Sequence, residues 1–398
     1  MAGKLLLSLA AAALSLLLAE GAVRLWQGQE DRSLLRLPPA ALLQKLPDLP
    51  LDNRERDNQM IGQNVALFAA YPQPAEVTSA FIGTSRSKVL RPDWYGLNGA
   101  INASGNFYNE ITYGLLLQAE ALRLQFPNLK TVYIETSLLL RRPDRLIVEA
   151  DHRKYLPLLE SLLPLRDQLP DGARFRREVE AAVATSEAPS WRQSQLLQHR
   201  ADLRLSNLFH SESEALTVRT DPFLKSLKAN GERKDPAGPA PDANKQVPSI
   251  AADNVKVTRM RDIAANAPWD HLFEMIALWG RANSVKIVFY QPPVRSDLYQ
   301  YQQQSGLAVH VADLEKISAT YDVPFIDLNR PDLHYADSWD LFADEDHLET
   351  CRGTVLLQIA ILEGARRFDA GLKPIALTRT DAEKKSATQL KKCETDAR

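Results

Sequence analysis

The stretch that decides the fold class covers residues 77–86 and reads VTSAFIGTSR. Residues 77–82 form a short run of mainly apolar side chains, which is typical of a buried strand, and Gly83 ends it. Ser85 follows after Thr84, where we expect a helix to begin. In open α/β sheets, ligands bind at the carboxyl ends of the strands. The stretch therefore predicts a core strand that leads into an exposed serine.

The chain repeats this pattern of strands and helices. Strands are predicted at residues 131–134, 285–290 and 323–327, and helices at residues 115–126, 271–279, 309–320 and 354–368. Residues 95–109, which are rich in asparagine and glycine, are predicted to form a turn region. Strands that alternate with helices indicate an α/β fold. We expect three layers, α/β/α, around a mainly parallel sheet.

The composition is that of an ordinary globular protein. Of 398 residues, 45% are hydrophobic and 25% are charged, which is enough apolar material for a sizeable core. We expect one α/β domain over residues 76–370, after a proline-rich stalk over residues 26–75. Residues from about 145 to 265 interrupt the alternation and are predicted to be a mostly helical insertion, which either gates a site or is decorative. The polar tail, residues 371–398, is predicted to be disordered.

The N-terminal 25 residues contain a charge-free apolar run from Leu5 to Ala19, preceded by Lys4. An uncleaved signal-anchor or transmembrane helix is our prediction; a cleaved signal peptide and a buried core helix are the alternatives. The bulky residues near Ala19 fit poorly with a cleavage site, and Lys4 favours an N-terminus on the inside. These features predict a single-pass inner-membrane protein with its main domain in the periplasm.

Several classes of function are disfavoured. The formal net charge of -2 gives no basic field for nucleic acid. There is no glycine-rich phosphate loop for a nucleotide. Cys351 and Cys393 are the only cysteines, so we expect neither a disulfide framework nor a zinc site, and no structural role for either residue. We predict no metal and no cofactor.

A base for Ser85 is found close to the C-terminus. A serine hydroxyl needs a base to become a nucleophile, and a third group must orient that base. Residues 342–348 read FADEDHL, and of the seven histidines His347 alone has an aspartate three residues before it. Asp344 is therefore predicted to orient His347. Asp346 is the alternative, disfavoured because adjacent side chains usually diverge.

The turn region offers donors for an oxyanion hole. Residues 102–106 read NASGN, and the backbone N–H groups of Gly105 and Ser85 could stabilise a tetrahedral oxyanion. The alternative is a loop whose glycine and asparagines serve backbone conformation alone. Arg86, Asn102 and Ser137 are candidate substrate contacts. For Arg86 the alternative is a structural ion pair.

These elements, in this order, resemble the SGNH hydrolase superfamily, the GDSL-like esterases. The resemblance rests on three motifs: Gly83-Thr84-Ser85 after the first strand, the Asn102-Ala103-Ser104-Gly105 loop, and Asp344-x-x-His347 near the C-terminus. The form of the first motif, the N-terminal run and the insertion are similar to an extracytoplasmic branch that includes alginate acetylation and teichoic-acid D-alanylation proteins.

The resemblance implies a flavodoxin-like fold and a serine esterase or O-acyltransferase. The implied substrates are acyl groups, O-acetyl above all, on a cell-surface or exported polysaccharide, and the implied partners are that polysaccharide, the membrane and a membrane acyl-donor protein. Two features depart from the family. Glu135-Thr136-Ser137 lacks the usual asparagine after the third strand, and Gly353 follows His347 by six residues rather than five.

The residues also bear on two other classes of protein. The missing asparagine favours the alternative of a catalytically weak or inactive envelope protein of the same fold that binds polysaccharide or scaffolds its export or modification, whereas the intact Ser85, Asp344 and His347 argue against it. An α/β-hydrolase is disfavoured because Ser87 stands where its nucleophile elbow requires glycine.

Overall fold

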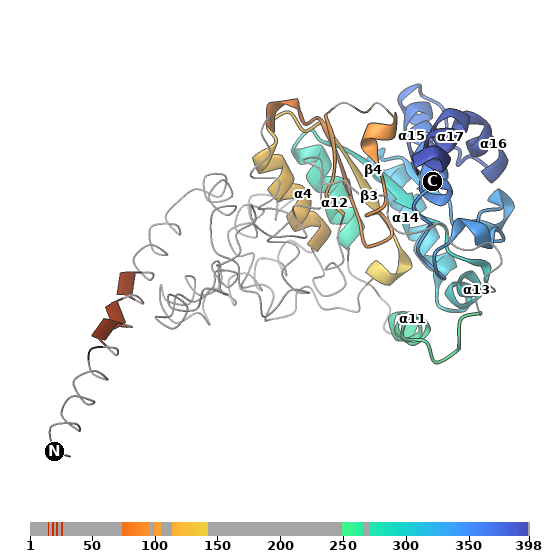
Figure 1. Ribbon diagram of the computed structural model, residues 1–398, viewed down its shortest axis with the longest axis horizontal. Coiled ribbons are helices and arrows are strands. Elements are labelled where there is room, and N and C mark those ends of the chain that lie inside the picture. Colours follow the sequence, from red (N-terminus) through yellow and green to blue (C-terminus); the bar gives the residue numbers. More distant parts are fainter. Residues whose placement is uncertain are drawn as a thin grey trace, which may run out of the picture.

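The protein is described here by a computed structural model, which covers residues 74–95, 97, 99–104, 114–141, 249–265 and 271–396, together with a few positions between 15 and 26. A five-stranded sheet forms its centre (Figure 1): β1 (Ser79–Ile82), β2 (Ala100–Asn102), β3 (Thr131–Glu135), β4 (Lys286–Gln291) and β5 (Phe325–Asp327). The spatial order is β2-β1-β3-β4-β5, and every neighbouring pair is parallel. The predicted α/β fold with a mainly parallel sheet is confirmed.

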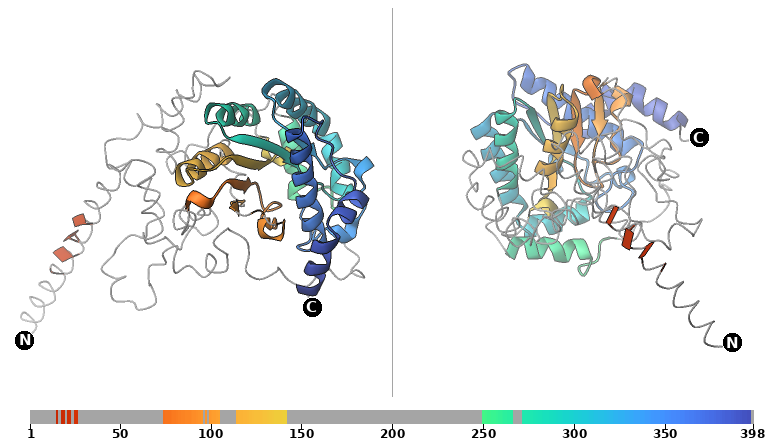
Figure 2. Two further views of the ribbon diagram at one scale, coloured as in Figure 1. Left: turned by 90° about the horizontal axis from the view of Figure 1, so that it is seen from above. Right: turned by 90° about the vertical axis from the view of Figure 1, so that its left-hand side faces the viewer.

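Helices cover both faces of the sheet (Figure 2). One face carries α4 (Gly114–Gln125), α12 (Leu272–Ala282) and α14 (Leu307–Tyr321), and the other carries α15 (Arg352–Asp369). Successive side chains of a strand point to opposite faces. Ala80 and Ile82 therefore pack into one core with Phe273 of α12, whereas Phe81 packs into the second core with Leu356 of α15.

A third apolar cluster lies beyond the carboxyl end of β3. It joins η6 (Leu138–Leu140), a short 3-10 helix, to α11 (Val255–Ala265) and α13 (Ser296–Gln304). Val257 and Met260 of α11 are fully buried there against Leu138 and Leu298. This packing fixes α11 at the end of the sheet where the strands that carry Ser85 and its neighbours terminate.

Within the α/β core, two elements were not expected from the sequence. Residues 100–102 form β2 inside the predicted turn region, and the polar segment of α13 is helical. The remaining predicted strands and helices of the core are present, with ends displaced by one to three residues in most cases.

The predicted disorder of the C-terminal tail is wrong. Residues 379–385 and 387–396 form α16 (Arg379–Lys385) and α17 (Ala387–Asp396). A disulfide between Cys351 and Cys393 joins α17 to the start of α15, so the expectation that these cysteines have no structural role is also wrong. The tail has a buried anchor at Ala382, Ser386 and Cys393 that its polar composition concealed.

The N-terminal prediction is corrected as well. Among the helices of the described residues, none combines the length and the apolar character needed to cross a membrane. This finding contradicts the predicted membrane helix, and with it the prediction of a single-pass inner-membrane protein with a periplasmic main domain. Most of residues 1–25, residues 27–73 of the predicted stalk and residues 145–248 of the predicted insertion lie outside the described residues.

Candidate active site

Ser85 lies in a tight turn at the carboxyl end of β1. The Ser87 N–H donates to the carbonyl of Thr84 (3.1 Å), and the Leu90 N–H donates to the carbonyl of Ser87 (3.1 Å). The segment forms consecutive turns rather than the regular helix that we expected after Ser85. Gly83 is required at the end of the strand, because a Cβ there would lie 2.5 Å from the Ser87 Oγ and 2.7 Å from a carboxylate oxygen of Glu135.

A buried ionic network supports this turn from below. The Glu135 carboxylate accepts hydrogen bonds from the Thr84 N–H (2.8 Å), the Thr84 hydroxyl (2.8 Å) and the Ser87 hydroxyl (2.6 Å). Arg86 forms an ion pair with Glu135 at 3.1 Å, and the Tyr290 hydroxyl donates to the Ser87 Oγ at 2.7 Å. Glu135 is fully buried. The backbone of the residues that flank Ser85 is thereby fixed by charge-assisted hydrogen bonds.

His347 is presented by a second turn, residues 343–347, which we call the acid loop. An antiparallel bridge between Phe342 and Leu348 closes the loop, and the Ala343 N–H donates to the His347 carbonyl at 2.8 Å. The Asp344 carboxylate accepts from the backbone N–H groups of Asp346 (2.9 Å) and His347 (2.8 Å). Short hydrogen bonds of this kind within the loop define the direction of the His347 side chain.

The two turns meet through the imidazole. His347 Nε2 lies 2.7 Å from the Ser85 Oγ, and His347 Nδ1 lies 2.7 Å from a carboxylate oxygen of Asp344. In the neutral tautomer that donates Nδ1–H to Asp344, Nε2 is free to accept the Ser85 proton. Both distances lie in the range for proton transfer through a hydrogen bond, about 2.6–3.2 Å. The structure thus brings together the three residues predicted as nucleophile, base and orienting acid.

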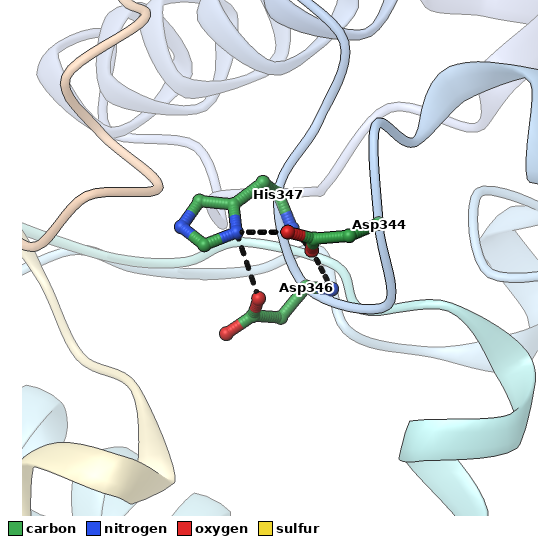
Figure 3. A group of neighbouring side chains, drawn as sticks. All are labelled: Asp344, Asp346 and His347. Carbon is green, nitrogen blue, oxygen red and sulfur yellow. Dashed lines mark hydrogen bonds and ion pairs between the residues drawn. The ribbon is translucent and has the colours of Figure 1, made fainter. Parts of the chain in front are cut away.

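A second carboxylate faces the same nitrogen (Figure 3). Asp346 lies 3.0 Å from His347 Nδ1, and its side chain is 6% exposed, compared with 43% for Asp344. The prediction favoured Asp344 over Asp346; both contact the ring, because the loop curls back on itself. Asp344 is the closer acceptor and Asp346 the more buried charge.

These contacts set the protonation states of the site. Burial by itself would lower the pKa of His347, but hydrogen bonds to Asp344 and Asp346, together with their charges, raise it to about 9. Burial likewise opposes ionisation of Asp346, yet the hydrogen bond to His347 and the charges of Arg86 and Lys256 hold its pKa well below the usual value. Burial opposes ionisation of Asp344 too, but its hydrogen bond to His347, the charge of His347 and the backbone hydrogen bond from Asp346 together lower its pKa. The site therefore holds two carboxylates against one imidazole.

The predicted substrate contacts are occupied in structural roles. Arg86 is 4% exposed and, besides Glu135, contacts the Ser137 hydroxyl, so the alternative of a structural ion pair describes it. The Asn102 amide donates to the carbonyls of Ser87 (3.0 Å) and Leu90 (2.9 Å). Ser137 is buried and caps η6 by accepting from the Leu139 N–H (3.2 Å). All three shape the turn after β1 or its surroundings.

The predicted oxyanion donors differ in what the structure shows. Gly105 lies outside the described residues. For the Ser85 N–H, no hydrogen-bond acceptor is found within the described part of the chain, which leaves it available to a developing oxyanion. After β3, where the asparagine is missing, the Thr136 hydroxyl donates to the Tyr290 carbonyl at 3.1 Å and Ser137 caps η6.

Sequence reasoning missed two residues that act on this site. In the sequence, Glu135 stands out only as part of a departure from a family motif, although a carboxylate at the end of a buried strand indicates a buried hydrogen-bond network. Lys256 was placed within the insertion, and its ammonium lies 2.5 Å from Asp346 and 2.9 Å from Glu345. No feature of the sequence around Lys256 points to the acid loop.

Asp344, Asp346 and His347 also form a group whose ligand atoms lie within 4.8 Å of one another, as in a metal site. The donor set does not fit a metal well. His347 Nε2 is directed at Ser85, and the carboxylate of Asp346 is already neutralised by the ammonium of Lys256. We therefore interpret the group as a proton-transfer site.

A scan against models of known protein families finds no match, and a search of curated proteins finds no significant match.

Proposed function

We propose that this chain is a serine esterase or O-acyltransferase in which Ser85 is the nucleophile and His347 is the base. The observation that carries the proposal is the continuous hydrogen-bonded line from Ser85 Oγ through His347 to Asp344, with 2.7 Å at each step. An aspartate–histidine pair on the surface would not require a serine beside the other ring nitrogen. Here that nitrogen contacts Ser85, which lies at the carboxyl end of β1, in a different part of the sheet from the acid loop.

The geometry supports a two-step acyl transfer. The Ser85 Oγ attacks an ester carbonyl and passes its proton to His347 Nε2, while Asp344 stabilises the imidazolium that forms. The Ser85 N–H supports the oxyanion of the tetrahedral intermediate. The intermediate then expels the alcohol, which takes the proton from His347, and leaves an acyl-enzyme. Water or a sugar hydroxyl attacks that ester, again with His347 as base, and regenerates Ser85.

The SGNH resemblance is part of this proposal. In its support, the strand order β2-β1-β3-β4-β5 is the flavodoxin-like order, which reverses between β1 and β3, the place where open α/β sheets bind their ligands. Ser85 follows β1, and the acid loop follows β5, the last strand in the described part of the chain. An O-acetyl ester on a sugar is the substrate to test first, since the resemblance implies it.

The test is covalent labelling of the full chain with a fluorophosphonate, which forms a stable adduct with an activated serine. We expect labelling of the wild-type chain and its loss in Ser85→Ala and His347→Ala. The matched controls are Ser249→Ala, at an exposed serine, and His271→Ala, at an exposed histidine whose Nδ1 pairs with Glu274 at 3.0 Å. Both controls should label like the wild-type chain.

Turnover of an acetylated sugar ester, followed by acetate release and by transfer to added sugar, separates hydrolysis from transfer. The proposal fails if the folded wild-type chain is not labelled and its turnover equals that of Ser85→Ala. In that event the non-catalytic, polysaccharide-binding alternative would be favoured, and binding of a neutral and an acidic polysaccharide would be measured next.

A further inference from the structure

Lys256 joins α11 to the acid loop. Its Nζ lies 2.5 Å from Asp346, 2.9 Å from Glu345 and 3.9 Å from Asp344, so one ammonium faces all three carboxylates of the loop. The Lys256 side chain is 25% exposed. Partial burial makes such contacts stronger than an exposed ion pair, whose contribution is usually small.

The fold places this lysine firmly. Its neighbour Val257 is fully buried in the cluster with η6 and α13, and the Lys256 N–H donates to the Asn254 side chain at 2.8 Å. Close by, the Ile250 N–H donates to Asp297 of α13 at 2.8 Å. Contacts of the residues before and after Lys256 in the sequence therefore fix its position, which does not depend on the acid loop alone.

Other cations near the loop have their own partners. Arg86, from the turn after β1, pairs with Glu135, and Arg295, which precedes α13, pairs with Asp297 at 2.6 Å. Arg295 also touches the loop, since its backbone N–H donates to the carbonyl of Glu345. Among the described lysines and arginines, Lys256 is the one whose side-chain ion pairs are all with the acid loop.

We propose that Lys256 is a positioning residue for His347: it holds the acid loop in shape and offsets the negative charge around the imidazole, so that the ring can lose its proton. This inference rests on the proposed function, because it concerns the same base. The reason is electrostatic. Asp344 and Asp346 both contact Nδ1 and stabilise the imidazolium, whereas a base must be neutral before it can accept the Ser85 proton.

Loss of the ammonium would remove the positive charge that Lys256 places 2.5 Å from Asp346 and 2.9 Å from Glu345. The pKa of His347, already raised to about 9 by the two aspartates, would then rise further. Below that pKa the neutral fraction of the imidazole falls tenfold for each pH unit. A modest electrostatic change therefore has a measurable effect on the rate near neutral pH.

The experiment is the pH dependence of fluorophosphonate labelling in Lys256→Met and Lys256→Arg. We expect Lys256→Met to move the midpoint upward by roughly 0.5–1 pH unit, which lowers the rate at pH 7.5 about three- to tenfold. Lys256→Arg, which keeps the charge, should stay near the wild-type midpoint. The matched control is Lys286→Met, at a lysine paired with Asp369 at the other end of β4.

A second measurement does not need catalysis. The 15N and 1H shifts of His347, assigned with His347→Ala, report its titration directly by NMR. Asp346→Asn should lower the midpoint, and the double variant Lys256→Met/Asp346→Asn should return it toward the wild-type value. Loss of packing alone would not produce this compensation. If Lys256→Met fails to fold, Asp346→Asn and the double variant carry the test.

The outcomes separate the two proposals. If the wild-type chain labels and Lys256→Met keeps its midpoint in both measurements, the role of Lys256 is overturned and the serine hydrolase proposal stands. If the wild-type chain does not label at any pH, the proposed function falls. A shift of the His347 titration in Lys256→Met would then still support the coupling of Lys256 to the ring.

Discussion

The imidazole Nε2 of His347 lies 2.7 Å from the hydroxyl of Ser85, although 262 residues separate them in the chain. The contact unites the turn after β1 with the acid loop after β5, on opposite sides of β3 and β4 in the sheet order. Each turn has internal or supporting hydrogen bonds of its own besides this contact. The meeting is thus a property of the whole sheet, and substitutions in either turn should act on the same reaction.

Asp344 and Asp346 should contribute unequally to catalysis. In Asp344→Asn the nearest acceptor of Nδ1–H is lost and the tautomer is no longer fixed, so kcat/KM should fall by roughly 10²–10⁴. Asp346→Asn keeps Asp344 in place and should cost about tenfold or less at high pH. Kinetics with an acetyl ester at pH 9.5 measures both. Equal losses in the two variants would contradict the assignment of Asp344 as the orienting acid.

Activity should be highest at alkaline pH. Because the pKa of His347 is raised to about 9, the ring is mostly imidazolium at neutral pH and cannot act as the base. Its raised pKa means that activity is lost as pH falls below about 9, by about tenfold per pH unit, and levels off above it. A labelling rate measured from pH 6 to pH 10 tests this directly. A profile that is flat from pH 7 upward would show that the imidazole titrates near its usual value.

Glu135 should be essential to the fold of the Ser85 turn. Glu135→Gln leaves the guanidinium of Arg86, which is 5% exposed, without its charge partner, and should cost roughly 3–5 kcal/mol in the free energy of unfolding. Urea denaturation followed by circular dichroism provides the measurement. The control is the double variant Arg86→Met/Glu135→Gln, whose loss in the free energy of unfolding should be smaller than the sum of the losses in the two single variants. Simple additivity would argue against a coupled pair.

The disulfide should stabilise the C-terminal helices more than the site. Cys351 and Cys393 are 42 residues apart in sequence, and loss of such a crosslink costs roughly 2–4 kcal/mol. In Cys393→Ser we expect earlier proteolytic cleavage in α16 and α17. The labelling of Ser85 should persist, because the bridge from Phe342 to Leu348 holds the acid loop independently. Loss of Ser85 labelling in a Cys393→Ser chain that is still fully folded would contradict the independence of the acid loop from the disulfide.

The parts of this protein that could be predicted are those with a local signal. The apolar runs of β1, β3, β4 and β5 mark the sheet, and Asp344 and His347 are three residues apart, a spacing that a single turn can satisfy. By contrast, β2 has only three residues and lies among asparagines and glycines, so its pattern is that of a turn. In α13, polar residues dominate and no apolar period emerges.

What could not be predicted depends on residues far away in the chain. Arg86 meets Glu135 across a gap of 49 residues, and Asn102 bonds carbonyls of the turn after β1, so neither is free for a substrate. Asp346 contacts His347 because the acid loop is curved, and the amino-acid sequence of the loop does not reveal this curvature. Lys256 reaches Asp346 across 90 residues, from the end of a segment that interrupts the core pattern.

The parallel order of the strands has a consequence for the chain as it is made. Ser85 leaves the ribosome early, on a strand that cannot pair completely until β3 is present, whereas His347 follows only after some 260 further residues. During synthesis, the serine is therefore an ordinary alcohol with no partner to take its proton. Under the proposed chemistry, an incomplete chain does not react with esters, and the appearance of reactivity at Ser85 would report that β5 and the acid loop have docked.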